Sequence, residues 1–319
     1  MEAPTGLFAR RKTATGSARL QAWLELFRLP NLLTVPGDVL AGASVAVLAG
    51  TQTVNFWNLS RVVLAVLAIY AMGLVQNDWI DLAEDRYHRP KRPLPSKRIS
   101  SSSAALAFLL CLVLGVLIAL SVSRQVFVGT LLLVALAWSY NVFLKKRLWG
   151  GAISMGLCRG MSVLLGAISM GWQSAVLPVF VGTVTYVGCV TWFAEGENRK
   201  QIPDARIYYP LYCFVIAWLL SLPMLLYYRA DITPGSFMLS LCCFLAAFLS
   251  VGYAGFSVHN RAIRPEQMRA LIASWLRSLL PWQAGWIVLF DSTWAVAVMV
   301  VLLLFWPLGI LLNKYFSQS

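Results

Sequence analysis

The chain has 319 residues, of which 59% are hydrophobic and only 12% are charged, and its mean hydropathy is +0.70. Soluble domains average about 25% charged residues, so this composition excludes a soluble globular protein. Continuous apolar runs of about 20 residues exclude a β-barrel, whose strands alternate. The net charge of +13 lies in the segments between these runs, which indicates membrane topology and no nucleic-acid partner.

The apolar runs predict an all-α polytopic membrane protein with nine transmembrane helices. These cover residues 32–50, 61–77, 104–122, 126–144, 152–170, 174–194, 208–228, 236–257 and 284–312. The ninth contains Asp291, so it is either one tilted helix or two shorter pieces. Residues 265–283 keep an apolar face beside Arg269 and Arg277, which indicates an amphipathic helix at the membrane surface, with a short extra span as the alternative.

The basic residues predict how these helices are oriented. With the N-terminus in the cytoplasm, 21 of the 26 Lys and Arg fall in cytoplasmic segments, four fall outside, and Arg159 lies within a span. This asymmetry satisfies the positive-inside rule and places the C-terminus on the outer side. We expect a basic cytoplasmic N-terminal segment at 1–31 and a single transmembrane domain at 32–319. The expected location is a bacterial inner (plasma) membrane.

A dense cluster of charge follows the second predicted helix, where residues 77–100 read NDWIDLAEDRYHRPKRPLPSKRIS. Asn77, Asp78, Asp81 and Asp85 share one face if the helix continues through them. Carboxylates this close repel one another unless a cation lies among them, and their hard oxygen atoms suit Mg²⁺, which usually also contacts a substrate phosphate.

The basic residues after this cluster suit the phosphate oxygen atoms that a metal leaves uncovered. The alternative is a solvated helix end of mixed charge. Ionisable groups beside a membrane interior favour a functional interpretation.

These residues resemble the first aspartate-rich motif of the UbiA-type intramembrane prenyltransferases. The similarity covers Asn77-Asp78-x-x-Asp81-x-x-x-Asp85 and the following RPLPS at 92–96. Further segments resemble the same family, namely RLPN at 28–31, WSYNVFLK at 138–145 and GLCRG at 156–160. The nine helices expected from hydropathy match the family's number.

The resemblance implies a Mg²⁺-dependent transfer of a prenyl group from a prenyl diphosphate to a small lipophilic or aromatic acceptor. Two aspartate-rich motifs would hold the metal and the diphosphate at a cytoplasmic active-site mouth, with an apolar chamber for the prenyl tail. For this sequence it implies metal ligands Asn77, Asp78, Asp81, Asp85, Glu195 and Glu197. It also implies catalytic roles for Asp78, Asp81, Asp85 and Lys145, and diphosphate contacts from Asn77, Arg92, Arg159 and Arg199.

The second motif departs from the family's pattern. Residues 191–200 read TWFAEGENRK, with Glu195 and Glu197 but no DxxxD. Glutamates two residues apart do not share a helix face. Either a loop rebuilds the second metal site, or one motif suffices, or the activity has changed. The alternatives are therefore a polyprenyl-lipid-binding protein and a UbiA-type terpene cyclase. Within the superfamily, the combination of motifs is similar to the EboC-like branch.

Two charged residues, Arg159 and Lys145, keep two interpretations each. Arg159 lies inside the fifth predicted span and is either a diphosphate contact or the partner of a carboxylate. Lys145 either contacts the diphosphate or anchors a helix end. Asp38, early in the first span, is a candidate for lining the chamber and binding the acceptor.

A transporter would concentrate polar groups near the midplane, whereas here they gather at the cytoplasmic ends.

Overall fold

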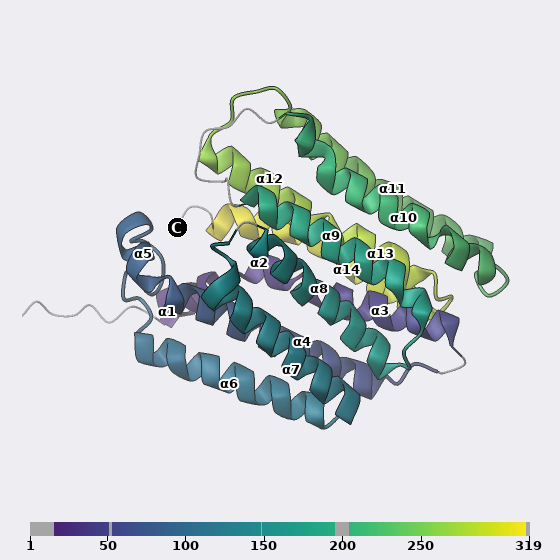
Figure 1. The fold of residues 1–319 in the computed structure, drawn as a ribbon, viewed down its shortest axis with the longest axis horizontal. Coiled ribbons are helices and arrows are strands. Elements are labelled where there is room, and N and C mark those ends of the chain that lie inside the picture. The colour runs from purple at the N-terminus through teal and green to yellow at the C-terminus, as the bar shows by residue number, and fades with distance from the viewer. Residues whose placement is uncertain (1–15, 51–52, 148, 195–203, 317–319) are drawn as a thin grey trace, which may run out of the picture.

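The computed structural model describes residues 16–50, 53–147, 149–194 and 204–316, and these ranges contain helices but no β-strand. The long helices run side by side along the long axis of the molecule (Figure 1). In chain order they are α2 (Leu29–Leu32) with α3 (Val35–Ala49), α4 (Phe56–Ile80), α6 (Ser101–Leu120), α7 (Arg124–Ser139) with the π-helix η1 (Tyr140–Leu144), α8 (Gly150–Ser169), α9 (Leu177–Ala194), α10 (Tyr209–Tyr227), α11 (Pro234–Val258) and α14 (Thr293–Phe316).

These helices confirm the predicted fold class. Within the described ranges, nine helical segments are long and apolar enough to cross a membrane. The first eight differ from the predicted bounds by up to about five residues at either end. The ninth predicted run, 284–312, divides between the end of α13 and α14, so of its two alternatives the structure shows two pieces.

Shorter helices lie at the ends of the bundle or between the long helices. They are α1 (Gly16–Leu26), α5 (Leu82–His88), the 3₁₀ turns η2 (Ser174–Val176) and η3 (Ala205–Tyr208), α12 (Pro265–Arg277) and α13 (Leu279–Val288). Figure 1 shows α1 and α5 together at one end, which we call the α5 end. The C-terminal ends of α3, α6 and α8 lie at the opposite end.

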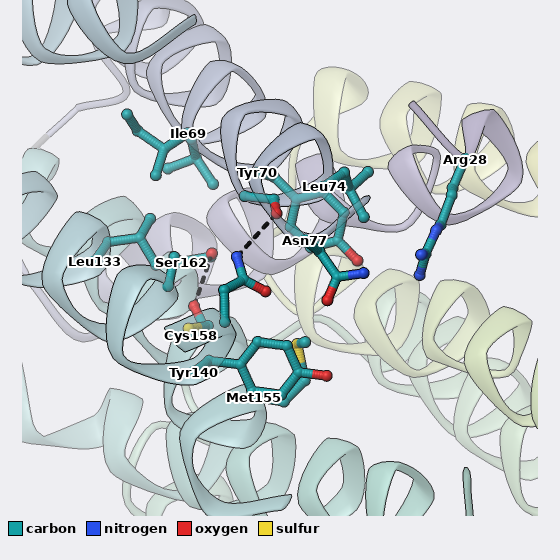
Figure 2. Close-up of a pocket in the computed structure, with 14 residues that line it drawn as sticks. Arg28, Ile69, Tyr70, Leu74, Asn77, Leu133, Tyr140, Met155, Cys158 and Ser162 are labelled. Atoms are coloured by element: carbon teal, nitrogen blue, oxygen red, sulfur yellow. Dashed lines mark hydrogen bonds between the residues drawn. The ribbon is translucent and has the colours of Figure 1, made fainter. Parts of the chain in front are cut away.

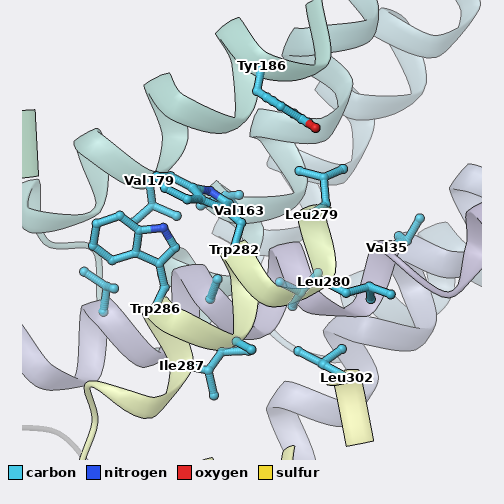
Figure 3. Packing of buried hydrophobic residues seen from close by; sticks show 14 of the residues in the cluster. Val35, Val163, Val179, Tyr186, Leu279, Leu280, Trp282, Trp286, Ile287 and Leu302 are labelled. Carbon is cyan, nitrogen blue, oxygen red and sulfur yellow. The ribbon is translucent and has the colours of Figure 1, made fainter. Parts of the chain in front are cut away.

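The expected surface helix at 265–283 is only partly correct. Helix α12 buries one face through Met268, Leu271 and Trp275 and is amphipathic as predicted. Residues 279–283 belong instead to α13, which is buried at all ten positions. Trp282 and Trp286 of α13 pack against Phe244 of α11, and Figure 3 shows both indoles inside the core. A helix of ten residues is too short for a hydropathy run to identify it as a span.

Helices α12 and α13 together cross the bundle as one broken element. Trp275 packs against Phe193 near the α5 end, whereas Phe290, just after α13, packs against Trp294. Trp294 in turn contacts Phe56 at the opposite end. The chain therefore reaches that end before α14 begins.

Helix α14 then returns to the α5 end. It contacts α2, its Gly309 lies against the Arg277 side chain, and its last turns lie on the side of α1 and α5 in Figure 1. The expectation that the C-terminus lies opposite the N-terminal helix is wrong, because α12 and α13 add a crossing.

This arrangement predicts that α1 and the end of α14 face the same side of the membrane. Protease-cleavable tags fused to the two termini should be cut together in sealed vesicles of one orientation and protected together in the other. A tag inserted between α10 and α11, at the opposite end, should show the reverse pattern. Cleavage of the two terminal tags from opposite sides would contradict the described fold.

Close backbone packing fixes α3 against α8. A Cβ atom at Gly42 would overlap the Val163 carbonyl group, and one at Gly166 would overlap the Val39 carbonyl group. Small residues at such crossings let helix backbones approach closely in membranes. The contact brings the start of α3 beside the middle of α8.

Candidate active site

The acidic motif lies at the α5 end, on a broken helix. Helix α4 ends at Ile80, Asp81 takes the non-helical angles φ −80° and ψ 0°, and α5 begins at Leu82. The four motif residues therefore do not share the face of one continuous helix. Asp78 and Asp85 are nevertheless close together, because the Arg92 guanidinium lies 3.6 Å from Asp78 and 2.7 Å from Asp85.

Each aspartate of the motif pairs with a basic side chain. Arg28 lies 2.9 Å from the carboxylate of Asp78, and Lys145 lies 2.5 Å from that of Asp81. The third pair joins Asp85 to Arg92. These contacts bring segments 28, 78–92 and 145 into one cluster. The diphosphate contact expected of Arg92 and the catalytic role expected of Lys145 stay predictions.

The sequence did not single out Arg28 as a site residue, although its RLPN segment carried part of the family resemblance. Arg28 has φ 44° in the turn between α1 and α2, a backbone conformation that costs energy in a non-glycine residue and tends to occur at functional sites. Burial by itself lowers the pKa of Arg28, but the adjacent Asp78 carboxylate outweighs this effect and raises the pKa. The guanidinium therefore stays charged.

Helix α1 holds this turn in place. Ala22 and Leu26 of α1 pack with Val75 and Leu94 in a small separate core at the α5 end. The adjoining ion pair between Arg98 and Glu25 measures 2.5 Å. The RPLPS segment that follows the acidic motif is thus anchored against α1.

A π-helical turn determines where Lys145 points. The Lys145 N–H donates to the carbonyl oxygen of Tyr140, five residues earlier. Such a turn rotates the following residues relative to an α-helix. Lys145 thereby reaches Asp81, and its Nζ lies 3.4 Å from Oδ1 of Asn77.

A cavity begins beside this cluster, with about 590 Å³ of empty space that includes its open mouth. It lies between α4, the α7–η1 segment and α8, with Arg28, Asn77 and Tyr140 among its polar lining residues. Figure 2 shows these three side chains near one another, with Ile69 and Leu133 farther along the wall. The rest of the lining is mainly apolar: Val66, Ile69, Gly73, Leu74, Leu133, Ala137, Met155 and Cys158.

The donor set of the motif fits a magnesium ion. The described residues contain no group of three His, Cys, Asp or Glu placed to hold a metal. Asn77, Asp78 and Asp81 nevertheless offer two carboxylates and an amide oxygen, and Mg²⁺ usually takes one or two carboxylates plus substrate phosphate oxygens. Asp85 pairs with Arg92, as Asp78 and Asp81 pair with Arg28 and Lys145, and its role as a metal ligand stays a prediction. The predictions for Glu195, Glu197 and Arg199 fall outside the described residues.

Arg159 lies apart from this cluster, in a buried network at the start of α3. Its Nε lies 2.5 Å from Oδ2 of Asp38, and its guanidinium donates to the hydroxyl and carbonyl groups of Thr34 at 2.9 and 3.0 Å. Gln283 of α13 donates to Asp38 at 2.6 Å. Of the two interpretations of Arg159, the structure shows the carboxylate partner.

Neither member of this ion pair lines the cavity. Arg159 is 3% exposed and Asp38 is fully buried. Asp38 therefore does not line the chamber as expected, and a diphosphate contact by Arg159 would require this network to open.

Known proteins resemble this chain over most of its length. The model of the UbiA prenyltransferase family matches residues 39–275. A digeranylgeranylglyceryl phosphate synthase of Methanococcus maripaludis is 25% identical over 65% of this chain and 76% of its own length. The synthase of the same name from Ignicoccus hospitalis is 29% identical over 51% of this chain, which spans about half (52%) of that relative.

One solved structure shows the same fold. It is the apo structure of a UbiA homolog from Aeropyrum pernix K1, which superposes with a TM-score of 0.57 at 14% identity. The superposition covers 89% of this chain and 98% of that one.

Proposed function

The chain belongs to the UbiA prenyltransferase family, and from that premise we propose that it is a Mg²⁺-dependent integral membrane prenyltransferase whose active site is the cluster at the α5 end. The observation that carries the proposal is the triad of ion pairs at one end of the apolar cavity. Three carboxylates and three fixed cations suit a magnesium diphosphate, and the cavity suits the attached prenyl chain.

We propose Asn77, Asp78 and Asp81 as the residues that would hold Mg²⁺, which would supply stabilisation of negative charge on the diphosphate. Arg28, Arg92 and Lys145 would bind the phosphate oxygens that face them. Each now neutralises a carboxylate, so the cluster is close to neutral, and its cations become available to phosphate when the carboxylates take a metal. A lone divalent cation would leave excess positive charge, so metal and diphosphate should bind together.

The reaction then follows from the charges. The bond between C1 of the prenyl group and the diphosphate oxygen breaks, and its electron pair stays on the diphosphate, where the three basic side chains stabilise it. The apolar lining keeps water from the allylic cation. An acceptor forms the new bond to C1 and loses a proton.

The proposed acceptor follows from the names of the two relatives. The relatives are named for a glyceryl phosphate lipid, so we propose a lipophilic glyceryl phosphate acceptor ahead of an aromatic one. Both relatives come from archaea. The location in a bacterial plasma membrane stays a prediction from the sequence. The similarity to the EboC-like branch stays a prediction as well.

The test is the release of pyrophosphate from a prenyl diphosphate in the presence of an acceptor. Purified protein in lipid nanodiscs with Mg²⁺ should release pyrophosphate from prenyl diphosphates of 10 to 20 carbons when a monoalkylglycerol phosphate or a hydroxybenzoate is supplied. No release with any chain length or acceptor would refute the enzyme. Tight binding of the prenyl diphosphate without release would support the lipid-binding alternative, which the unusual segment 191–200 motivates.

Arg28→Leu should weaken prenyl diphosphate binding by roughly 10- to 100-fold, since a hydrogen bond to a charged group contributes about 1.5–3 kcal/mol. The measurement is calorimetric titration of a non-hydrolysable prenyl thiolodiphosphate with Mg²⁺. Arg98→Leu is the matched control, because Arg98 pairs with Glu25 at the same end but does not line the cavity. Equal losses in the two variants would mean that Arg28 acts only through the fold.

A further inference from the structure

Asn141 places a polar atom in the wall of the largely apolar cavity. The residue is 2% exposed. Its Nδ2 donates to the Gly73 carbonyl oxygen and to Oε1 of Gln76, each at 2.9 Å. A main-chain carbonyl group only accepts hydrogen bonds, so the atom facing it is the nitrogen, and the orientation of the amide is determined.

The other end of this amide has no partner. Oδ1 of Asn141 is buried and accepts no hydrogen bond from any part of the chain that the structure describes. Leaving a buried acceptor unsatisfied is costly, and such a group calls for an explanation. By contrast, the hydroxyl of Ser162 in the same cavity donates to the Cys158 carbonyl oxygen of its own helix.

The Asn141 amide lies deeper in the cavity than the ion-pair cluster. Its amide is bonded to Gly73, one α4 turn, about 5.4 Å, from Asn77. Oδ1 of Asn77 lies 3.4 Å from Lys145 in the ion-pair cluster. The Asn141 amide is therefore about one turn deeper than the proposed diphosphate position, where C1 of a prenyl group would lie.

The backbone at Asn141 is also irregular. Asn141 belongs to the π-helix Tyr140–Leu144, a type of turn that is rare and often found at functional sites. The same turn directs Lys145 to Asp81. One irregular segment thus aims a cation at the acidic motif and an amide at the cavity below it.

We propose that Oδ1 of Asn141 accepts a hydrogen bond from the reacting hydroxyl group of the acceptor, which makes the acceptor an alcohol that is prenylated on oxygen. This inference rests on the proposed function. The hydrogen bond orients an oxygen lone pair toward C1. The bond from C1 to the diphosphate breaks, the ether bond from C1 to the acceptor oxygen forms, and the hydroxyl proton passes to the released diphosphate.

Asn141→Leu removes the acceptor atom while keeping similar volume, and Ser221→Ala of α10 is the control. Both side chains are buried, but Ser221 does not line the cavity and its hydroxyl donates to the Trp218 carbonyl oxygen of its own helix. Asn141→Leu should lower kcat/KM for a monoalkylglycerol phosphate about 100-fold and leave the affinity for a prenyl thiolodiphosphate with Mg²⁺ within about twofold. Ser221→Ala should change neither quantity by more than about twofold.

The wild-type protein provides a second test that does not depend on the folding of a variant. It should bind the monoalkylglycerol phosphate at least tenfold more tightly than the analogue in which hydrogen replaces the free hydroxyl, and the product should contain a new ether linkage. Equal binding of the two probes, or a product prenylated on carbon, would overturn the inference.

Retained discrimination in Asn141→Leu would overturn it as well, and so would a parallel loss of diphosphate affinity. If the wild type released no pyrophosphate with any acceptor, the proposed function itself would fail. That outcome is distinct from the failure of Asn141 in an active enzyme.

Discussion

Asp81→Ala should reduce prenyl-dependent pyrophosphate release by about a thousandfold or more. Asp81 contributes a proposed metal ligand and also positions Lys145 through their 2.5 Å ion pair. Loss of a single group that stabilises developing charge costs about 10²- to 10³-fold in rate, and this substitution affects two such groups. The measurement is single-turnover release of labelled pyrophosphate at saturating Mg²⁺.

Glu84→Ala is the control for Asp81→Ala. Glu84 is an exposed carboxylate three residues farther along the chain, and it pairs with Lys146 at 3.0 Å. The Lys146 ammonium lowers the pKa of Glu84, so the carboxylate is charged at neutral pH but lies outside the cavity lining. Its removal should change the rate by less than about threefold, the scale of a weak surface ion pair. Comparable losses in both variants would contradict the proposed site.

Arg159→Met should destabilise the folded protein by about 3–5 kcal/mol, because it leaves the Asp38 carboxylate buried without its partner. Among the described residues, Asp38 would then keep the hydrogen bond from Gln283 alone. Thermal unfolding of the purified protein in detergent, followed by circular dichroism, measures the effect. The double variant Arg159→Met/Asp38→Leu should recover much of the loss, since it removes both charges.

Arg206→Met is the matched control for this second prediction. Arg206 pairs with Asp204 at 2.8 Å, but both side chains are more than half exposed. This substitution should leave the unfolding temperature unchanged. If Arg159→Met instead folded normally and lost only diphosphate affinity, Arg159 would be a diphosphate contact, the other of the two interpretations that the sequence left open.

The outcome for Arg159 shows where a single sequence is insufficient. A guanidinium inside a span must have a partner, and the sequence contained several carboxylates near enough to provide one. The choice of Asp38 depends on the close approach of α3 and α8 at Gly42 and Gly166. That contact joins segments more than 120 residues apart, and no local pattern encodes it.

The sequence by itself determined the class of the protein, its nine long apolar helices and the acidic motif with its basic neighbours. These features depend on composition, on run length and on local spacing, all of which a single segment carries. Only the tertiary structure decided that α12 and α13 form a crossing that returns α14 to the α5 end, because two short helices reveal their course only through packing.

The tertiary structure also decided which cation faces which carboxylate. The Arg28 backbone conformation and the π-turn before Lys145 are held by contacts with α1, α4 and α5. The amide of Asn141 is held in the cavity wall by its hydrogen bonds to Gly73 and Gln76 of α4. Ion pairs and cavities form between elements distant in sequence, so their geometry depends on how the whole bundle packs.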